Sequence, residues 1–269
     1  MKTILVATEK PFAKAAVDNI KKIITDAGYQ IELLEKYTSK NELINAVKNA
    51  NALIIRSDII DKEVINSAPN LEIVVRAGAG YDNIDLNACT DKGIVAMNTP
   101  GQNSNAVAEL VFGLLIYHIR KHFDGSTGTE LRGKTIGLFG YGNIGKIVAK
   151  IAQGFGMIVH AYDPFLENSV IEKDNVVAEK SPEDLFSKCQ YISLHIPANE
   201  KTKKSINYSL ISLMPQNACI VNTARKEIIN EDDLLKVFET RNDFSYLSDI
   251  EPDNKNVIIE KYSGRFLFT

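Results

Sequence analysis

Three glycines have a spacing that is typical of loops binding the phosphates of a dinucleotide. Gly140, Gly142 and Gly145 follow the apolar segment 135–139 in the pattern G-x-G-x-x-G, and a helical pattern starts directly after them. Gly140 permits a tight turn, Gly142 lets the backbone approach a pyrophosphate, and Gly145 lets the helix pack closely on the strand. The N-terminus of that helix would offer unpaired N–H groups to the phosphates.

A carboxylate ends the next predicted strand. Residues 157–162 are mostly apolar and Asp163 follows them, so strand, helix and strand form one complete βαβ unit. An acid here meets the ribose hydroxyls and repels the 2′-phosphate of NADP, and Pro164 and Phe165 supply no arginine to counter it. The sequence therefore predicts an NAD site. The alternative, a glycine turn without a ligand, is disfavoured by the flanking elements.

A second set of residues suited to binding follows two strands predicted in the first hundred residues. Arg56 and Ser57 come after one strand and Arg76 comes after the next. A guanidinium can clamp a carboxylate or phosphate, and a glycine-rich turn exposes successive N–H groups. We expect these loops to receive two ends of one small acid. The alternative is that the arginines make surface salt bridges and the glycines only shape a turn. That turn consists of Ala77, Gly78, Ala79 and Gly80.

The elements that would carry these residues alternate between strand and helix along the whole chain. This pattern predicts an α/β protein with two doubly wound parallel-sheet domains, a flavodoxin-like domain at 1–98 and a Rossmann dinucleotide-binding domain at 99–269. Ser39 and Glu42 form a capping box before one helix. The strands are expected at 3–7, 31–34, 52–55, 73–75 and 94–97, and then at 135–139, 157–162, 191–195, 218–222 and 245–248.

Between the two predicted domains, Pro100 and Gly101 mark a linker that continues as a long helix to about residue 121. We expect a cleft between the domains, floored by 103–109, to take a small substrate. Polar residues also follow several strands of the second domain and are expected to face the same crevice. They are His195 and Pro197, the segment 223–225, and the segment 249–251.

Composition excludes several classes of protein. The 269 residues are 45% hydrophobic and 24% charged, and the net charge of −3 gives no electrostatic reason to expect nucleic acid as a partner. No signal peptide or membrane-spanning run is found, so no membrane partner and a cytoplasmic location are expected. Cys89, Cys189 and Cys219 lack a C-x-x-C pattern and are expected to be reduced and buried.

Eight blocks of the chain together resemble one family of enzymes. They read RSD, VVRAGAGYDNIDL, GIVAMNTPGQNSNAVAEL, GKTIGLFGYGNIG, YDPF, SLHIP, NTARKEII and DIEP. In this order and spacing the chain resembles the D-isomer-specific 2-hydroxyacid dehydrogenases over nearly its whole length. The resemblance is strongest to members that use NAD to oxidise D-3-phosphoglycerate to 3-phosphooxypyruvate, at the entry to L-serine biosynthesis. It implies a homodimer that pairs through the helix after Pro100.

The resemblance also implies roles for single residues. Arg225 would bind the substrate carboxylate and polarise the carbonyl, and Glu251 would support the general base, with Glu260 as the fallback. The turn 77–80 would hold the substrate carboxylate. Arg56, Ser57 and Asn103 would line the phosphate end. The positions matching NAD contacts are Asn143, Ile144, Asp163, His195, Thr223, Ala224 and Asp249.

The family's general base is a histidine after Thr-Pro, and no histidine lies beyond residue 195. Either the segment 256–259 is the strand before that motif, or 266–268 is that strand and the sequence stops at Thr269 where the motif would begin. We prefer the second alignment, in which the first domain lacks its C-terminal return segment and the base. His195 matches a cofactor contact better than a base.

The other histidines suggest no site. His160 lies mid-strand, where packing explains it. His118 and His122 lie four residues apart on one helix, but no third metal ligand has suitable spacing, so no metal is expected.

Two classes of function remain open at this point. The chain is either an NAD-dependent 2-hydroxyacid dehydrogenase acting on a phosphorylated acid or another 2-hydroxy acid, or an NAD-binding interaction protein without catalysis. Arg225 and the two anion loops favour the enzyme. Loss of the base favours the silent protein or a slow catalyst.

Overall fold

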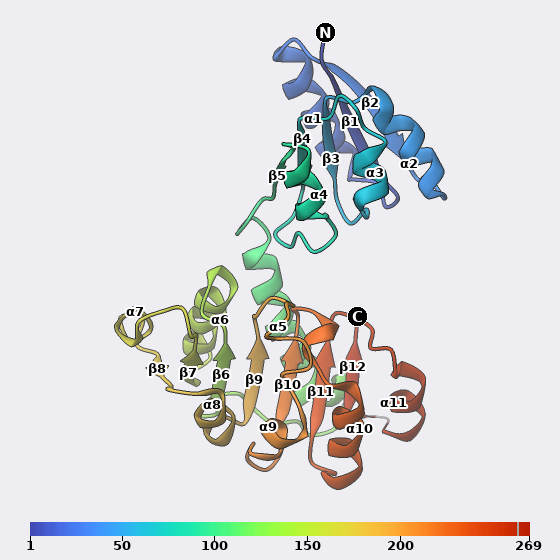
Figure 1. The fold of residues 1–269 in the computed structure, drawn as a ribbon. Helices are drawn as coiled ribbons and strands as arrows, with labels where there is room; N and C mark the ends of the chain where they lie inside the picture. Colours follow the sequence, from blue (N-terminus) through green and yellow to red (C-terminus); the bar gives the residue numbers. More distant parts are fainter. Residues whose placement is uncertain (263) are drawn as a thin grey trace. The chain divides into compact units, whose positions relative to one another are not determined.

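The structure is a computed structural model that describes residues 1–262 and 264–269. It divides into two compact units, Met1–Asn103 and Ser104–Thr269, and each unit is built around one parallel sheet (Figure 1). Within the described residues, no helix is both long and apolar enough to cross a membrane.

The first unit contains a five-stranded sheet in the order β2-β1-β3-β4-β5, with every neighbouring pair parallel. This is the flavodoxin-like strand order, in which the direction of winding reverses between β1 and β3. Its strands are β1 (Thr3–Thr8), β2 (Gln30–Glu35), β3 (Ala52–Ile55), β4 (Ile73–Arg76) and β5 (Val95–Met97). Its helices are α1 (Lys14–Asp26), α2 (Lys40–Ala46), the 3₁₀ turn η1 (Val47–Asn49), α3 (Lys62–Asn66) and α4 (Leu86–Asp91).

The second unit contains a seven-stranded parallel sheet in the order β12-β11-β10-β9-β6-β7-β8. Counted from β6, this is the Rossmann order with one more strand at the far edge, and the winding reverses between β6 and β9. Its strands are β6 (Thr135–Phe139), β7 (Ile158–Tyr162), β8 (Val177–Ala178), β9 (Tyr191–Leu194), β10 (Cys219–Asn222), β11 (Ser245–Ser248) and β12 (Phe266–Phe268).

Helices cover both faces of this second sheet. On one face α5 (Ser104–Ile119) and α6 (Asn143–Gly154) pack into a core with β6 and β7. On the other face α8 (Pro182–Lys188), α9 (Tyr208–Ser212), α10 (Glu231–Thr240) and α11 (Lys255–Lys261) enclose a second core. The remaining elements are α7 (Asn168–Glu172) and the 3₁₀ turns η2 (Lys121–Phe123) and η3 (Lys226–Ile228). The structure thus confirms an α/β protein with two doubly wound sheets.

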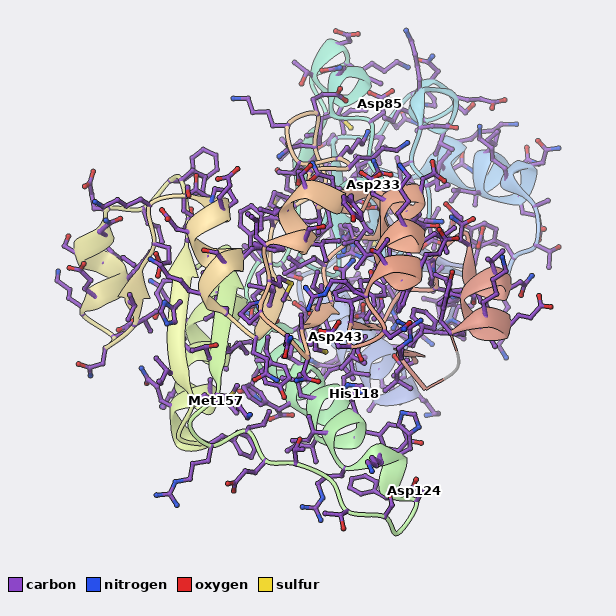
Figure 2. The ribbon with its side chains drawn as sticks, turned by 90° about the horizontal axis from the view of Figure 1, so that it is seen from below. Asp85, His118, Asp124, Met157, Asp233 and Asp243 are labelled. Carbon is purple, nitrogen blue, oxygen red and sulfur yellow. The ribbon has the colours of Figure 1, made fainter. Side chains whose placement is uncertain are left out.

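Local signals in the sequence account for many helix starts. The capping box before α2 is present, because the Glu42 carboxylate accepts a hydrogen bond from the Ser39 amide at 3.1 Å. Side chains of Ser181 and Asn230 cap α8 and α10. Asp233 lies in the first turn of α10 (Figure 2), where a negative charge is favourable.

Of the two alternatives for the C-terminal segment, the first is wrong. Residues 256–259 belong to helix α11 (Lys255–Lys261) and not to a strand, and Ile258 is the residue of this helix that is buried. A short apolar run does not distinguish helix from strand by periodicity alone. The second alternative is confirmed as far as the strand is concerned, since 266–268 form β12, which pairs in parallel with β11.

Candidate cofactor and substrate site

The three glycines of the fingerprint differ in their surroundings. Gly140 has a φ of +99°, and a Cβ built there would lie 2.8 Å from the carbonyl oxygen of His195. A Cβ on Gly145 would lie 2.4 Å from the carbonyl oxygen of Gly140. A Cβ on Gly142 would meet no described atom within 4 Å. Gly140 and Gly145 are therefore required by the fold, whereas Gly142 leaves space open beside the N-terminus of α6.

The carboxylate of Asp163 is held beside this loop. One of its oxygens accepts a hydrogen bond from the Tyr141 amide at 2.9 Å, and the other accepts from the Phe165 amide at 3.0 Å. These two bonds fix the position of the carboxylate at the end of β7. The acid predicted to select NAD thus lies directly against the backbone of the glycine loop.

Tyr141 is a residue of this loop that the sequence reasoning missed. Its side chain is fully buried, and its hydroxyl donates a hydrogen bond to Asp174 at 2.8 Å. Its amide holds Asp163, so one residue connects the loop to two carboxylates. The only available signal was its place between Gly140 and Gly142, where a large polar-tipped side chain must point into the protein.

His195 lies on the neighbouring strand end at the point where winding reverses. Its amide donates to the Phe139 carbonyl at 2.8 Å, and its Nε2 lies 2.9 Å from the Ser193 hydroxyl. Nδ1 is buried without a hydrogen-bond partner among the described residues. Burial lowers the pKa of His195 to about 3, which keeps the ring neutral near pH 7. A general base needs a pKa near the working pH, so this geometry supports a contact role rather than a base.

The loop after β10 is organised by Asn222, which the sequence reasoning also missed. Its Nδ2 donates to the Arg225 carbonyl and to the Tyr246 hydroxyl, both at 3.0 Å, and its Oδ1 accepts from the Ala224 amide at 3.0 Å. The Arg225 guanidinium donates to the Ala224 carbonyl at 2.8 Å. Asn222 therefore fixes the backbone from which Arg225 projects.

Two more predicted residues lie at neighbouring strand ends with buried polar atoms. The Thr223 hydroxyl and one Asp249 oxygen have no hydrogen-bond partner among the described residues. Burial raises the pKa of Asp249, since desolvation disfavours its charged form. Buried polar atoms in a native protein normally have partners. Together with the nearby ring nitrogen of His195 and the open space at Gly142, these atoms fit a polar ligand at the carboxyl edge of this sheet.

Glu251 and its fallback lie in exposed positions. The Glu251 carboxylate is 2.5 Å from the ammonium of the half-buried Lys255 in an i,i+4 pair, and Lys255 also lies 5.0 Å from the centre of the Phe268 ring. Glu260 lies on the exposed side of α11.

In the first unit, the two predicted anion loops are connected to each other. The Arg76 Nε donates to the Arg56 carbonyl at 2.9 Å. A Cβ on Gly78 would lie 2.1 Å from an Arg76 guanidinium nitrogen, so this glycine lets the side chain lie across the turn. Arg56 and Ser57 are exposed, which leaves their side chains accessible.

The remaining predicted residues occupy loop and helix-start positions. Asn143 and Ile144 open α6, with Asn143 exposed and Ile144 half-buried. Ala224 is half-buried and Pro197 is exposed. In the first unit, Ala77, Ala79 and Gly80 are half-buried and Asn103 is exposed.

The cysteines and the remaining histidines lie apart from these loops. All three cysteines are free and buried, as expected, and burial raises the pKa of Cys189 to about 12. His118 lies near the end of α5 and Asp124 in the turn that follows (Figure 2). Burial lowers the pKa of His118. Within the described part of the chain, no three His, Cys, Asp or Glu residues gather as metal ligands would.

Comparison with known proteins gives the class to which this arrangement belongs. A sequence model of the D-isomer specific 2-hydroxyacid dehydrogenases, NAD binding domain, matches residues 117–257. The chain is 38% identical over 220 residues to the hydroxypyruvate reductase of Thermotoga maritima, which covers 76% of this chain and 70% of that protein. The chain therefore belongs to the D-isomer specific 2-hydroxyacid dehydrogenase family, and residues 117–257 form the NAD-binding domain of that family.

Within the family, several relatives carry one name. The chain is 37% identical over 235 residues to the D-3-phosphoglycerate dehydrogenase of Methanocaldococcus jannaschii, covering 81% of this chain but 44% of that protein. The chain thus spans less than half the length of that relative. It also matches the crystal structure of the NAD⁺-bound 3-phosphoglycerate dehydrogenase of Entamoeba histolytica with a TM-score of 0.94 and 46% identity, over 100% of this chain and 86% of that one.

Proposed function

We propose that this chain is an NAD-dependent dehydrogenase that oxidises D-3-phosphoglycerate to 3-phosphooxypyruvate, the first step of L-serine biosynthesis. The observation that carries this proposal is the 46% identity along the full chain to a 3-phosphoglycerate dehydrogenase with bound NAD⁺. The glycine loop with Asp163 supports the cofactor, and the arginine-bearing loops of the first unit support an acid with two anionic ends.

The proposal assigns each unit one task. Residues Met1–Asn103 bind the acid and residues Ser104–Thr269 bind the cofactor. Gly140, Gly142 and Gly145 with the N-terminus of α6 receive the pyrophosphate, and Asp163 receives the ribose hydroxyls. The remaining cofactor contacts are Asn143, Ile144, His195, Pro197, Thr223, Ala224 and Asp249.

The chemistry divides between cofactor and protein. NAD, when bound, supplies the acceptor for the hydride that leaves the C2 carbon of the acid. Arg225 binds the carboxylate and stabilises the negative charge that develops on the oxygen at C2. Arg56, Ser57 and Asn103 line the phosphate end, and the turn 77–80 with Arg76 holds the carboxylate through backbone N–H groups and a guanidinium. The proton of the C2 hydroxyl must pass to a general base, and Glu251 is the carboxylate assigned to support that base. None of the four histidines of this sequence is assigned as the base.

The test is an initial-rate assay of NADH formation by the full-length protein with D-3-phosphoglycerate. We expect turnover that Arg225→Ala lowers by at least 100-fold, about 2.7 kcal/mol of transition-state stabilisation, while NADH affinity changes little. Arg241→Ala is the matched control, because Arg241 lies at the opposite end of the second unit's sheet from the cofactor loops and pairs with Asp243. NADH binding without turnover of any 2-hydroxy acid would favour a silent NAD-binding protein instead.

One observation supports a different candidate substrate. The similarity to a hydroxypyruvate reductase makes hydroxypyruvate the competing candidate. The reverse assay with NADH separates the two, since a phosphoglycerate enzyme prefers 3-phosphooxypyruvate and a hydroxypyruvate reductase prefers the unphosphorylated acid.

We also propose that the protein works as a homodimer in the cytoplasm. The end of the long helix α5 carries exposed aromatic surface. Tyr117 is 36% exposed and Phe123 is 65% exposed, and their rings contact each other with centroids 5.5 Å apart. Exposed apolar surface of this kind favours association.

The cysteines support the proposed location in the cytoplasm, because free, buried cysteines suit a reducing compartment.

A further inference from the structure

A buried carboxylate connects the strand ends of the first unit. Asp58 is 3% exposed. One of its oxygens accepts hydrogen bonds from the Glu9 amide at 2.8 Å and from the Tyr37 hydroxyl at 2.7 Å. The other oxygen accepts from the Arg56 amide at 3.1 Å. Three segments that are far apart in the sequence therefore meet on one side chain.

The carboxylate of Asp58 lies between the ends of β1 and β3. Glu9 directly follows β1 and Arg56 directly follows β3, and the winding of the sheet reverses between these two strands. In doubly wound sheets the ends of the two strands at such a reversal form the ligand crevice, because the connections leave it in opposite directions. Asp58 holds the two sides of this crevice together.

Asp58 is also linked, through its backbone, to the loop that follows β4. The Asp58 carbonyl accepts a hydrogen bond from Asn83 Nδ2 at 2.7 Å, which fixes the backbone at residue 58. The Arg56 carbonyl accepts from Arg76 Nε at 2.9 Å. The Arg56 peptide is thus held on both sides, by Asp58 at its amide and by Arg76 at its carbonyl. Arg56 itself is exposed, so its guanidinium stays accessible to a ligand.

The three hydrogen-bond donors around position 58 require a carboxylate side chain. Both carboxylate oxygens can accept hydrogen bonds and each faces N–H or O–H donors, so all three donors are satisfied at once. The hydroxyl of Tyr37 keeps its proton, because burial and the bond to Asp58 raise the pKa of this tyrosine. An amide of the same shape would turn an NH₂ group toward one of the two backbone N–H groups and leave it without an acceptor.

We propose that Asp58 is a positioning residue for substrate binding, which sets the loop bearing Arg56 at the anion site of the first unit without touching the substrate itself. The inference rests on the proposed function in that the anion is the phosphorylated end of the acid. Its consequence is selective: loss of Asp58 weakens recognition of the phosphorylated acid and leaves the cofactor site in the second unit intact.

The test compares Asp58→Asn with Asp61→Asn, the same change three residues further along. Asn also caps helices well, so Asp61→Asn keeps the cap of α3. For Asp58→Asn we expect the KM for 3-phosphooxypyruvate to rise at least tenfold. The kcat and the Kd for NADH should change less than threefold, and the KM for unphosphorylated hydroxypyruvate should rise less than that for the phosphorylated acid. Asp61→Asn should match the wild type in all four quantities.

Asn83→Ala provides a milder variant for the case that Asp58→Asn does not fold. It removes one bond to the Asp58 carbonyl and keeps the carboxylate. We expect a KM increase of about threefold for the phosphorylated acid, with unchanged NADH affinity.

The outcomes separate this inference from the proposed function. A folded Asp58→Asn variant with an unchanged KM would overturn the positioning role while leaving the proposed reaction in place. So would a variant in which kcat and NADH affinity fall as strongly as KM rises. If calorimetry shows that the wild type binds NADH but not D-3-phosphoglycerate, the proposed substrate fails and the role of Asp58 fails with it.

Discussion

Asp163 shows how one side chain can decide which cofactor is bound. Its two oxygens are held by the Tyr141 and Phe165 amides, so the negative charge cannot easily move away from the ribose position. We predict that Asp163→Ser raises the affinity ratio of NADPH to NADH at least tenfold, because a repulsive charge next to the 2′-phosphate is removed. Fluorescence titration with both nucleotides measures this ratio.

The control for this variant is Glu167→Ser, which makes the same change in net charge four residues later at an exposed position. It should leave the ratio unchanged. An equal shift in both variants would mean that overall charge, and not the contact at Asp163, determines the preference.

His195 predicts a pH dependence of stability. Burial lowers the pKa of His195 to about 3 in the folded protein, whereas an unfolded histidine has a pKa of about 6.5. Between these values the unfolded chain binds a proton that the folded chain does not, so the free energy of unfolding falls as the pH falls from about 6.5 toward 3. Between pH 7 and pH 5 this loss should be about 1–2 kcal/mol.

The measurement is urea unfolding at pH 7 and pH 5 for the wild type and His195→Gln. The variant should lose less stability on acidification, by about the same 1–2 kcal/mol, because glutamine does not titrate. Identical pH dependences would show that His195 is protonated as readily in the folded protein as in the unfolded chain.

At the scale of elements, the conformation of the loop after β10 depends on the side-chain amide of Asn222. We predict that Asn222→Ala lowers the free energy of unfolding by about 2–3 kcal/mol, because the half-buried Ala224 amide and the buried Tyr246 hydroxyl each lose a hydrogen-bond partner. Turnover should fall more than tenfold, since the backbone of Arg225 is released. Tyr246→Phe is the control, because it removes only the bond to the tyrosine. It should reduce stability without the loss of turnover, and a parallel loss of activity in both variants would count against the loop argument.

The elements themselves were largely predictable from the sequence. Segment 135–139 is largely apolar and is followed by Gly140, so both its type and its end could be read directly. The strand at 245–248 was also predicted with the bounds that β11 has. The prediction for 256–259 stayed open because three apolar residues suit a helix or a strand equally well. The two-residue strand β8 was missed because a segment so short carries no period.

The site was less predictable than the elements. Gly140, Asp163 and Arg225 could be found because they follow strands in a known motif or match a family block. Tyr141, Asp58 and Asn222 could not, because their importance lies in bonds to groups far away in the sequence. A buried carboxylate such as Asp58 looks in the sequence like any loop acid. Only the fold shows that three strand ends converge on it.

At the scale of the whole molecule, the proposed dimer predicts a change in mass. Phe123→Asp places a charge on the exposed aromatic surface at the end of α5, where Phe123 is 65% exposed. Burying an unpaired charge in an interface is strongly unfavourable, so we expect the mass measured by light scattering to fall to that of one chain. Phe165→Asp, at a residue 90% exposed elsewhere on the second unit, should leave the mass unchanged. A dimer that survives Phe123→Asp would place the interface elsewhere.

The proposed activity requires that the second unit hold NAD at the loop 140–145 beside Asp163. Calorimetric titration of NADH into the wild type and into Gly142→Val tests this most directly, because a Cβ at Gly142 would meet no described atom within 4 Å beyond its chain neighbours, so the fold has space for the substitution. The account predicts one NADH per chain in the wild type and at least 100-fold weaker binding in the variant, at an unchanged free energy of unfolding. Equal binding in both proteins, or no binding in the wild type, would contradict it.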